Sequence, residues 1–279
     1  MNWPRTVLMV TPNGFRVEYA INPYMLDSNG NLQNINSLTA LKQWTDIKGE
    51  FERLGLRVEI VEGRDQFPDM VFCANQTLPV LDQTGAQHLV LSRMNSPQRA
   101  GEVPFFKEWA DARGTPVFTM TDFNFEGGGD AIWNYETGEL FGGHGFRTDP
   151  RAYEALEQRF GLQVCRLQLV NEDFYHLDTC LAILNGTTVA LVREAFDEKS
   201  LKTIESKFTT IIEIDPVEAR KYFAGNCVSV DGKNVILQKG SHKLVADLKR
   251  HGFKPIEVDT SEFIKAGGSA FCIKQLLFT

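Results

Sequence analysis

The chain has 279 residues and a formal net charge of −7 at pH 7, with 43% hydrophobic and 23% charged residues. This composition is typical of a globular protein and excludes collagen, coiled coil and intrinsic disorder. The acidic excess, without any cluster of Lys and Arg, argues against nucleic-acid binding, and no apolar stretch approaches the roughly 18 residues that a membrane-spanning helix needs.

In chain order, the predicted elements begin with a strand at 6–10, a helix at about 38–54 that stops at Gly55, and a strand at 56–61. Four further groups each contain a two-stranded hairpin, then a helix, then another strand. Their predicted ranges are 77–81, 88–92, 97–113 and 116–120; 130–134, 139–142, 148–161 and 162–169; 178–184, 187–192, 198–208 and 210–214; and 227–230, 234–238, 241–251 and 255–258.

Two of the hairpins carry strong turn signals, at Asn185-Gly186 and at Asp231-Gly232. Asn-Gly and Asp-Gly pairs favour two-residue type I′ turns, in which both central residues adopt a positive φ. We therefore predict type I′ turns at both places.

A last predicted strand, at 269–278, completes the N-terminal group, which otherwise lacks the first strand of its hairpin. The chain then contains about five ββαβ units that close into a ring, and closure by the two ends leaves no open sheet edge. The fold class is thus α/β, as a five-fold pseudosymmetric α/β-propeller, in a single domain over 1–279. The alternative is an open α/β sheet, but its parallel strands need helical crossovers, whereas hairpins separate the helices here.

Polar residues gather where the first strand of each unit reaches the centre of the predicted ring. They are Asn75, Glu126, His176, Asp178, Asn226 and Cys272. A thiol, an imidazole and two carboxylates from separate units are the groups that a cysteine nucleophile and its acid–base partners require. The sequence therefore predicts a thiol-dependent active site.

Each of these residues also has a structural interpretation. Cys272 lies in an apolar segment, where free cysteines are commonly buried filler, but Gly267-Gly268-Ser269 upstream would let backbone approach a ligand. His176 and Asp178 would share one face of a strand, either as a catalytic or as a structural pair. Glu126 precedes three glycines, which indicate either a tight turn or backbone pressed against a bulky group.

The cysteines indicate the compartment in which the protein functions. Cys73, Cys165, Cys180 and Cys227 lack a comparable setting and are predicted to be core residues. An odd number of widely spaced cysteines, with no signal peptide at the start, predicts a reduced, cytoplasmic protein.

A metal centre is the chemical rival. His176, Asp178 and Cys180 would share a strand face, and Cys272 could supply a fourth ligand. This spacing is not one of the common zinc patterns, so we predict that the site holds no metal.

Three motifs together resemble the guanidino-group-modifying enzymes, which share the pentein α/β-propeller fold. The motifs are Phe-Glu-Gly-Gly-Gly-Asp at 125–130, His-Leu-Asp at 176–178 and Gly-Gly-Ser-Ala-Phe-Cys at 267–272. The family includes arginine deiminases, dimethylarginine dimethylaminohydrolases, amidinotransferases and arginine dihydrolases. The similarity extends from Tyr19 to Cys272.

The resemblance implies a covalent mechanism with no metal or organic cofactor. Cys272 would attack the guanidinium carbon and form an S-alkylthiouronium, while His176 would protonate the leaving amine and later activate water. Glu126 and Asp178 would bind guanidinium nitrogens, and Glu126 would also orient His176. Converging carboxylates suit a planar cation with several N–H donors, and the bound cation should lower the pKa of the thiol.

The resemblance also implies contacts to the rest of a small-molecule substrate. Arg147 matches the arginine that clamps the α-carboxylate, and Arg93 and Asn22 match substrate-contacting positions of the arginine dihydrolase branch. Asp130, which ends the first motif, is placed with these substrate-binding residues.

Asn75 distinguishes the branches, because deiminases and dimethylaminohydrolases carry an acidic residue in this region whereas arginine dihydrolases carry Asn. A neutral amide can donate and accept, and so can hold a neutral urea. We therefore predict a dihydrolase that converts arginine to ornithine, ammonia and carbon dioxide. The alternatives are dimethylarginine hydrolysis, deimination to citrulline, amidino transfer, and a non-catalytic pentein that only binds. A homo-oligomer is compatible with each of these functions.

Overall fold

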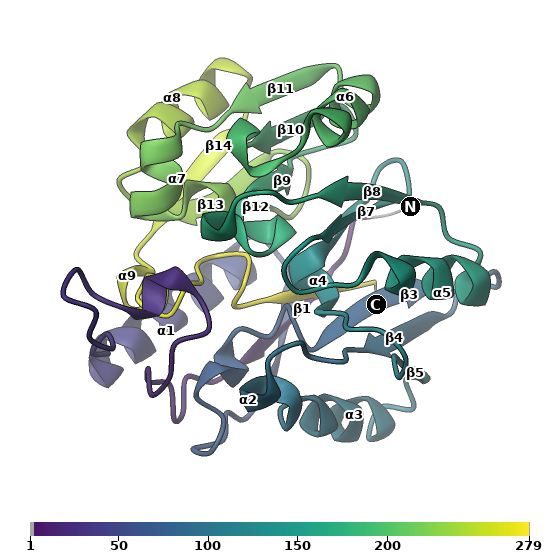
Figure 1. Ribbon diagram of the computed structural model, residues 1–279, viewed down its shortest axis with the longest axis horizontal. Helices are drawn as coiled ribbons and strands as arrows, with labels where there is room; N and C mark the ends of the chain where they lie inside the picture. Colours follow the sequence, from purple (N-terminus) through teal and green to yellow (C-terminus); the bar gives the residue numbers. More distant parts are fainter. Residues whose placement is uncertain (1–2, 279) are drawn as a thin grey trace.

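The computed structural model describes residues 3–278 and contains five three-stranded sheets arranged around a common centre (Figure 1). In every sheet the middle strand pairs antiparallel with one neighbour and parallel with the other. The parallel pair is joined through a helix, as parallel pairing requires. The five predicted ββαβ units and their ring arrangement are therefore confirmed.

The first module joins segments from opposite ends of the described chain. Strand β1 (Thr6–Val10) pairs in parallel with β2 (Arg57–Val61) through α1 (Ser37–Arg53), and antiparallel with β15 (Gln275–Leu277). The pairing of Thr6 with Leu277 closes the ring as the sequence predicts.

The other four modules follow one another along the chain. Their elements are β3 (Thr77–Leu81), β4 (Gln87–Leu91), α2 (Pro97–Ala100), α3 (Val103–Asp111) and β5 (Val117–Thr119); β6 (Ala131–Asn134), β7 (Glu139–His144), α5 (Pro150–Phe160) and β8 (Val164–Gln168); β9 (Leu181–Ile183), β10 (Thr188–Leu191), α6 (Glu198–Lys207) and β11 (Thr210–Glu213); and β12 (Val228–Ser229), β13 (Asn234–Gln238), α8 (His242–Arg250) and β14 (Lys254–Val258). Short helices α4 (Gly127–Asp130), α7 (Pro216–Tyr222) and α9 (Ser261–Ile264) lie between modules.

Local signals explain why the helices form where they do. The side chain of Asp149 accepts a hydrogen bond from the first turn of α5, and Gly161 ends that helix with a left-handed φ of 70°. Helix α1 buries Trp44, Ile47 and Phe51 on one face, at helical spacing. Each helix thus covers its own sheet with a single apolar face.

The predicted helix at 97–113 is wrong in one respect, because the structure breaks it into α2 and α3. Pro104 has no N–H to donate to Ala100 and its ring would crowd that carbonyl group, so a continuous helix cannot pass. Gly101 lies at the break, where a Cβ atom would come within 2.5 Å of the Phe67 ring. Arg99 and Glu102, on either side of the break, form a buried ion pair.

Neither predicted type I′ turn forms. Such turns need a positive φ at both central residues, but only Gly232 of the four has one, at 74°. The side chain of Asn185 accepts from the backbone N–H groups of residues 187 and 188, and Asp231 accepts from those of residues 233 and 234. Side-chain hydrogen bonds of this kind stabilise a longer loop in place of the two-residue turn.

Two predicted strands, at 178–184 and 269–278, are shorter in the structure. Before β9 the backbone forms a 3-10 turn, η4 (Leu177–Thr179), and Cys272 lies in a turn before β15. His176 and Asp178 consequently do not share a strand face. The turn separates them because residue 179 donates its N–H back to the carbonyl group of His176.

Within residues 3–278, every helix is too short or too polar to cross a lipid bilayer.

Candidate active site

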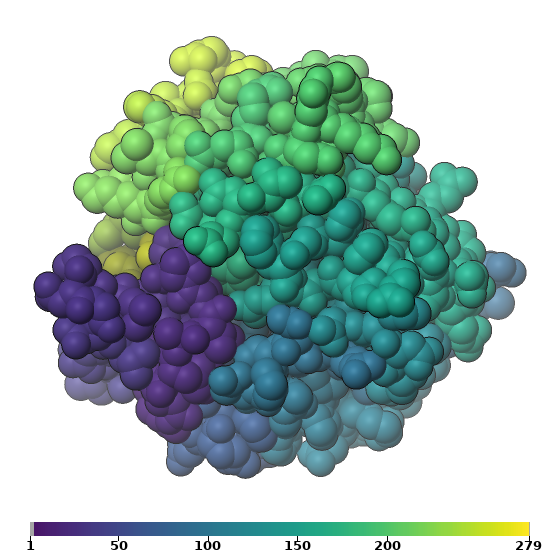
Figure 2. All heavy atoms as spheres, viewed as in Figure 1, coloured from purple at the N-terminus to yellow at the C-terminus, as the bar shows by residue number. Residues whose placement is uncertain are grey.

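A cavity lies where the segments preceding β3, β9 and β15 meet beneath the connection between β1 and α1. About 280 Å³ of space inside it is not filled by atoms. Its lining comprises Ile21, Asn22, Met25, Asp69, Phe72, Asn75, Arg99, Arg147, Tyr175, His176, Ala266, Gly267 and Cys272. In Figure 2 the N-terminal connection, in purple, lies over this face of the molecule against the blue and teal modules. Segments that are far apart in sequence thus supply one site.

The thiol of Cys272 is buried between an acceptor and a donor. Its Sγ atom lies 3.1 Å from Oδ2 of Asp178 and 3.1 Å from Nδ2 of Asn226. Burial and the neighbouring Asp178 carboxylate raise the pKa of the Cys272 thiol well above its usual range. In the ligand-free protein the thiol is therefore protonated and donates to Asp178.

His176 is held by a buried carboxylate. Its Nε2 atom lies 2.6 Å from Oε2 of Glu126, and Arg147 Nη1 lies 3.2 Å from the same oxygen. The other oxygen of Glu126 accepts from the backbone N–H of Asn95 at 2.9 Å. Burial alone would raise the pKa of Glu126, but the hydrogen bond with His176 and the Arg147 charge hold it below its ordinary range. Since protein groups occupy both oxygens, this carboxylate is arranged to orient the imidazole.

Among the described residues, three other buried carboxylates each keep one oxygen without a hydrogen-bond partner, namely Oδ1 of Asp69, Oδ1 of Asp178 and Oδ2 of Asp130. Asp69 lines the cavity and Asp178 contacts the Cys272 thiol, so these two belong to the site. Their second oxygens accept from the Tyr19 hydroxyl, at 2.8 Å, and from the Cys272 thiol. Burial raises the pKa of both carboxyl groups, that of Asp178 to about 7. A buried acceptor without a partner is costly unless a ligand satisfies it, so both oxygens are suited to N–H donors of a bound cation.

Asp69 is a site residue that the sequence analysis missed. It is the only charged residue in the run 67–74, which is otherwise apolar, and it lies six positions before Asn75. A carboxylate inside an apolar run is the signal that could have identified it, because carboxylates are rarely buried without a partner or a task.

The amide of Asn75 has a defined orientation. Its Oδ1 atom accepts from Arg99 Nη1 at 2.8 Å, and its Nδ2 atom lies 3.5 Å from Nδ1 of His176. Because a guanidinium group has only donors, the atom facing Arg99 must be the oxygen. The N–H side of Asn75 is therefore turned toward the imidazole and the cavity.

Arg99, which lines the cavity, belongs to a buried ion pair that the sequence analysis also missed. It lies 2.9 Å from Glu102 and donates further to the carbonyl groups of Asp69 and Phe72. Arg99 and Glu102 are three positions apart in the sequence, and both side chains are buried. The pair supports the backbone segment that carries both Asp69 and Asn75.

Arg99→Met is expected to lower the free energy of unfolding by about 3–5 kcal/mol, because it leaves the carboxylate of Glu102 buried and unpaired. Urea unfolding followed by circular dichroism measures the loss. Arg151→Met, at an exposed salt bridge on α5, is the matched control and should change stability by under about 1 kcal/mol. Equal losses in the two variants would contradict a stabilising role for the buried pair.

Among the other predicted residues, Arg147 and Asn22 reach the cavity. Arg147 donates to the carbonyl group of Ile21 at 2.7 Å, and its guanidinium lies 4.9 Å from the centre of the Tyr175 ring. The amide of Asn22 donates to the carbonyl group of Ala266 at 3.0 Å. These two side chains line the side of the cavity nearest the N-terminal connection.

Arg93 and Asp130 do not line this cavity. Arg93 is exposed and donates to the carbonyl group of Thr121. Asp130 is buried, and its Oδ1 atom accepts from the backbone N–H of Leu177 at 3.0 Å. Asp130 thus supports the turn that carries His176, and Arg93 lies at the surface.

Two glycines of the predicted motifs are required by close contacts. A Cβ atom on Gly129 would lie 2.1 Å from Nδ2 of Asn75, and one on Gly267 would lie 2.6 Å from the Asn22 amide. Gly267 also has a φ of 84°, which side chains rarely tolerate. The glycines therefore let site residues approach the backbone closely.

Within residues 3–278, no group of three or more His, Cys, Asp and Glu side chains is arranged to hold a metal ion. The alternative zinc set depended on His176, Asp178 and Cys180 sharing a strand face. In the structure the thiol of Cys180 contacts the carbonyl groups of His176 and Leu177. The turn at η4 thus removes the geometry on which that alternative relied.

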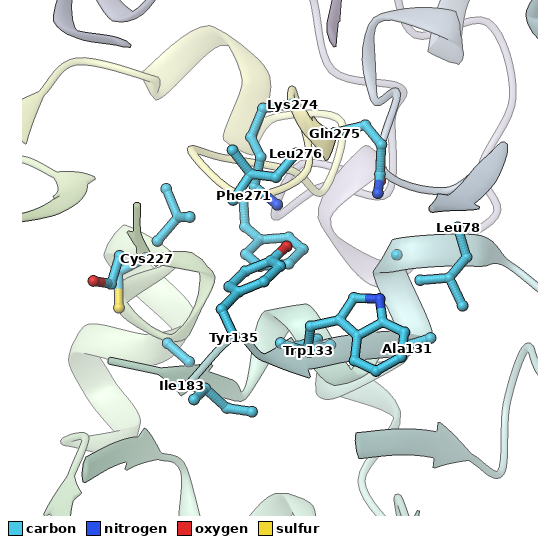
Figure 3. A pocket seen from close by; sticks show the side chains of 15 residues that line it. Leu78, Ala131, Trp133, Tyr135, Ile183, Cys227, Phe271, Lys274, Gln275 and Leu276 are labelled. Carbon is cyan, nitrogen blue, oxygen red and sulfur yellow. The ribbon is translucent and has the colours of Figure 1, made fainter. Parts of the chain in front are cut away.

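A second cavity lies nearer the inner strands (Figure 3). Its lining includes Trp133, Tyr135, Ile183 and Leu276, with Lys274 Nζ 3.0 Å from the centre of the Phe271 ring. Burial lowers the pKa of Lys274 to about 7. Cys272 and His176 do not line this second cavity. The thiol and the imidazole belong to the first cavity instead.

Comparison with known proteins gives a consistent result. The family model for eukaryotic N,N dimethylarginine dimethylhydrolase matches residues 12–279. The bifunctional arginine dihydrolase/ornithine cyclodeaminase ArgZ of Synechocystis sp. is 34% identical over 96% of this chain, which spans only 37% of that protein. The N(G),N(G)-dimethylarginine dimethylaminohydrolase of Mycobacterium tuberculosis is 36% identical, over 96% of this chain and 85% of its own length.

Solved structures agree with these matches. The N-terminal domain of ArgZ bound to substrate, described as an arginine dihydrolase of cyanobacteria, has a TM-score of 0.90 at 32% identity, over 98% of this chain and 99% of that one. A dimethylarginine dimethylaminohydrolase adduct has a TM-score of 0.78 at 23% identity, over 98% and 99% of the two chains, and shows the shared fold.

Proposed function

Because this chain belongs to the dimethylarginine dimethylaminohydrolase family of pentein enzymes, we propose that it hydrolyses guanidino C–N bonds of arginine or a close derivative and is an arginine dihydrolase. The observation that carries the proposal is the pair of unpartnered carboxylate oxygens, on Asp69 and Asp178, in the site that holds Cys272. A guanidinium group brings N–H donors in a plane and matches such acceptors.

The reaction begins from a protonated thiol. The guanidinium donates to Asp69 and to the free oxygen of Asp178, and its positive charge favours loss of the thiol proton, which passes to the Asp178 oxygen that already accepts it. The sulfur of Cys272 then forms a bond to the guanidinium carbon. His176, oriented by Glu126, protonates the departing nitrogen, the C–N bond breaks, and ammonia and an S-alkylthiouronium result.

Water completes the first cycle. His176 takes a proton from water, the oxygen bonds to the same carbon, and the sulfur leaves, which gives citrulline. In a second cycle the sulfur attacks the urea carbon, a second ammonia leaves, and water releases a carbamate that breaks down to ornithine and carbon dioxide. Overall, arginine and two water molecules yield ornithine, two ammonia and carbon dioxide.

The orientation of Asn75 supports the second cycle. Arg99 occupies its oxygen, so Asn75 offers an N–H group to the cavity. An N–H donor can bind the carbonyl oxygen of a urea, whereas a carboxylate there would repel it. Arg147 and Asn22 are the proposed contacts for the amino-acid end of the substrate, while Arg93 is left out because it is exposed, and Asp130 because its Oδ1 atom holds the backbone N–H of Leu177.

The direct experiment is to supply arginine and quantify ammonia, citrulline and ornithine over time. We expect two ammonia molecules per ornithine and only transient citrulline. Lasting accumulation of citrulline without ornithine would reject the second cycle but retain the first. Absence of ammonia from arginine, methylated arginines, agmatine and succinylarginine would reject the function itself.

Asn75→Asp is expected to shift the products toward citrulline by about 5- to 150-fold, since a single lost hydrogen bond to a buried group is worth roughly 1–3 kcal/mol. The carboxylate would still face Arg99 but would present an oxygen to the urea carbonyl. The measurement is the citrulline-to-ornithine ratio at equal arginine turnover. An unchanged ratio would exclude Asn75 as the determinant of the second cycle.

Dimethylarginine hydrolysis is the second candidate, because the M. tuberculosis relative with that name is covered over 85% of its length. Release of dimethylamine from asymmetric dimethylarginine, faster than release of ammonia from arginine, would favour it.

We further infer a cytoplasmic enzyme in which 1–279 acts as one catalytic domain, with a small molecule as its partner. The five cysteines are free in the structure, which supports a reducing compartment.

A homo-oligomer is supported by exposed leucines near the first helix, namely Leu26, Leu32, Leu38 and Leu41. Light scattering of the purified chain measures its mass in solution.

A further inference from the structure

Asn226 is a buried residue at the end of η6 (Ala224–Asn226), and it lies behind the turn that carries Cys272. The backbone leading to it is unusual. Phe223 has a φ of 51° and is the only non-glycine residue with a positive φ in residues 3–278. The left-handed backbone conformation raises the free energy of a bulky residue by of order 1–3 kcal/mol, and it persists only where the surrounding structure requires it.

The oxygen of the Asn226 side chain binds the backbone of the Cys272 turn. Its Oδ1 atom accepts from the N–H groups of Ser269, Phe271 and Cys272, at 3.1, 3.0 and 3.2 Å. One side-chain oxygen therefore accepts from three buried N–H groups of the same turn, of which that of Phe271 also donates to the backbone carbonyl group of Asn226. These bonds fix the position of the Cys272 backbone.

The nitrogen of the same amide reaches the sulfur. Its Nδ2 atom donates to Sγ of Cys272 at 3.1 Å and to the carbonyl group of Asp178 at 2.9 Å. The sulfur thus accepts from Asn226 on one side and donates to Asp178 on the other. Once the thiol proton is lost, the bond from Asn226 is a protein hydrogen bond that stabilises the thiolate.

Other charged or titratable groups also surround the sulfur. Asp178 raises the pKa of the thiol, whereas the buried Lys274 and the Tyr175 hydroxyl interact with it electrostatically from neighbouring turns. His176 lines the same cavity. Of these groups, none combines a direct N–H bond to the sulfur with support of its backbone.

We propose that Asn226 is a positioning residue with two separable tasks, holding the turn of Cys272 through its oxygen and stabilising the thiolate through its N–H. The proposal takes Cys272 as the nucleophile of the proposed function. It concerns the reactivity of the thiol and not the choice of guanidino substrate.

The two tasks can be separated by two substitutions. Asn226→Asp keeps an oxygen for the three backbone donors but replaces the N–H donor at the sulfur with a second oxygen. Asn226→Ala removes both groups. The measurement is the rate of alkylation of Cys272 by iodoacetamide as a function of pH, read by intact mass and peptide mapping, without any substrate.

We expect Asn226→Asp to raise the midpoint of the alkylation profile by at least about one pH unit, and to lower kcat for arginine by about tenfold or more with little change in KM. Hydrogen exchange at residues 269–272 should stay close to that of the unsubstituted protein. Asn226→Ala should raise the midpoint less, because it adds no charge, but should accelerate exchange of those amides.

Asn134→Asp is the matched control. Asn134 is equally buried and also caps two backbone N–H groups while donating to a carbonyl group, but it lies on β6 and does not contact Cys272. It should lower stability without moving the alkylation midpoint.

An alkylation midpoint of Asn226→Asp within about 0.3 pH units of the unsubstituted protein would overturn the thiolate task. Failure of both variants to fold would overturn the proposal as well, because Asn226 would then be a structural residue. Absence of arginine turnover in the unsubstituted protein would reject the proposed function but would leave the alkylation test intact.

Discussion

Replacing Cys272 with serine is expected to lower kcat by at least about 10³-fold. Serine retains the size and hydrogen-bonding sites of cysteine, but its hydroxyl is a far poorer nucleophile and leaving group. In a cavity where burial already raises the pKa of the thiol, an alkoxide would not form. Ammonia release from arginine is the measurement, with circular dichroism to verify folding.

Cys165→Ser is the control for this prediction, because Cys165 is buried on β8, outside the cavity. It should retain turnover within a few-fold. Acid quenching of the unsubstituted enzyme during turnover should also reveal a covalent adduct on Cys272 by intact mass. Undiminished turnover of Cys272→Ser would remove the covalent mechanism through this thiol.

His176→Gln is expected to lower kcat by about 10²–10⁴-fold, the range typical of a lost general acid or base. Glutamine can still contact Glu126 but cannot deliver a proton to the leaving nitrogen or take one from water. Because proton transfer is needed in both halves of the reaction, neither citrulline nor ornithine should form at an appreciable rate. Steady-state ammonia release measures the effect.

His251→Gln is a suitable control, since His251 is exposed at the end of α8. Its turnover should equal that of the unsubstituted enzyme. A loss of kcat below tenfold in a correctly folded His176→Gln variant would contradict the assignment. Removing an imidazole that transfers protons should lower kcat by more than that.

The ring of five modules could be predicted from the sequence because its evidence is local and repeated. Hairpins, helix ends and turn residues recur in the same order, and each copy supports the others. The predictions of local structure failed where a single residue prevents the element that its neighbours in the sequence favour. Pro104 breaks a helix whose apolar spacing continues past it, and the side chains of Asn185 and Asp231 cap backbone groups that a two-residue turn would arrange differently.

The site could be predicted only in part. Cys272 and Glu126 stand beside glycine-rich motifs and His176 lies in the His-Leu-Asp motif, so their chemistry is visible in the chain. Asp69 and Arg99 are not marked in this way, because their task depends on partners that only the tertiary structure brings near. The roles of both Asn75 and Glu126 likewise depend on which of their atoms other residues already occupy.

The pairing of β15 with β1 has a consequence during synthesis. Leu277 lies opposite Thr6, so the first sheet stays incomplete until nearly the whole described chain has been translated. At typical elongation rates of about 5–20 residues per second, this interval lasts roughly 15–55 s. Throughout this interval, the nascent polypeptide exposes the edge of β1 that β15 later covers, and Cys272 has not yet emerged from the ribosome. The complete first sheet and the Cys272 thiol therefore become available together, late in the synthesis of this segment.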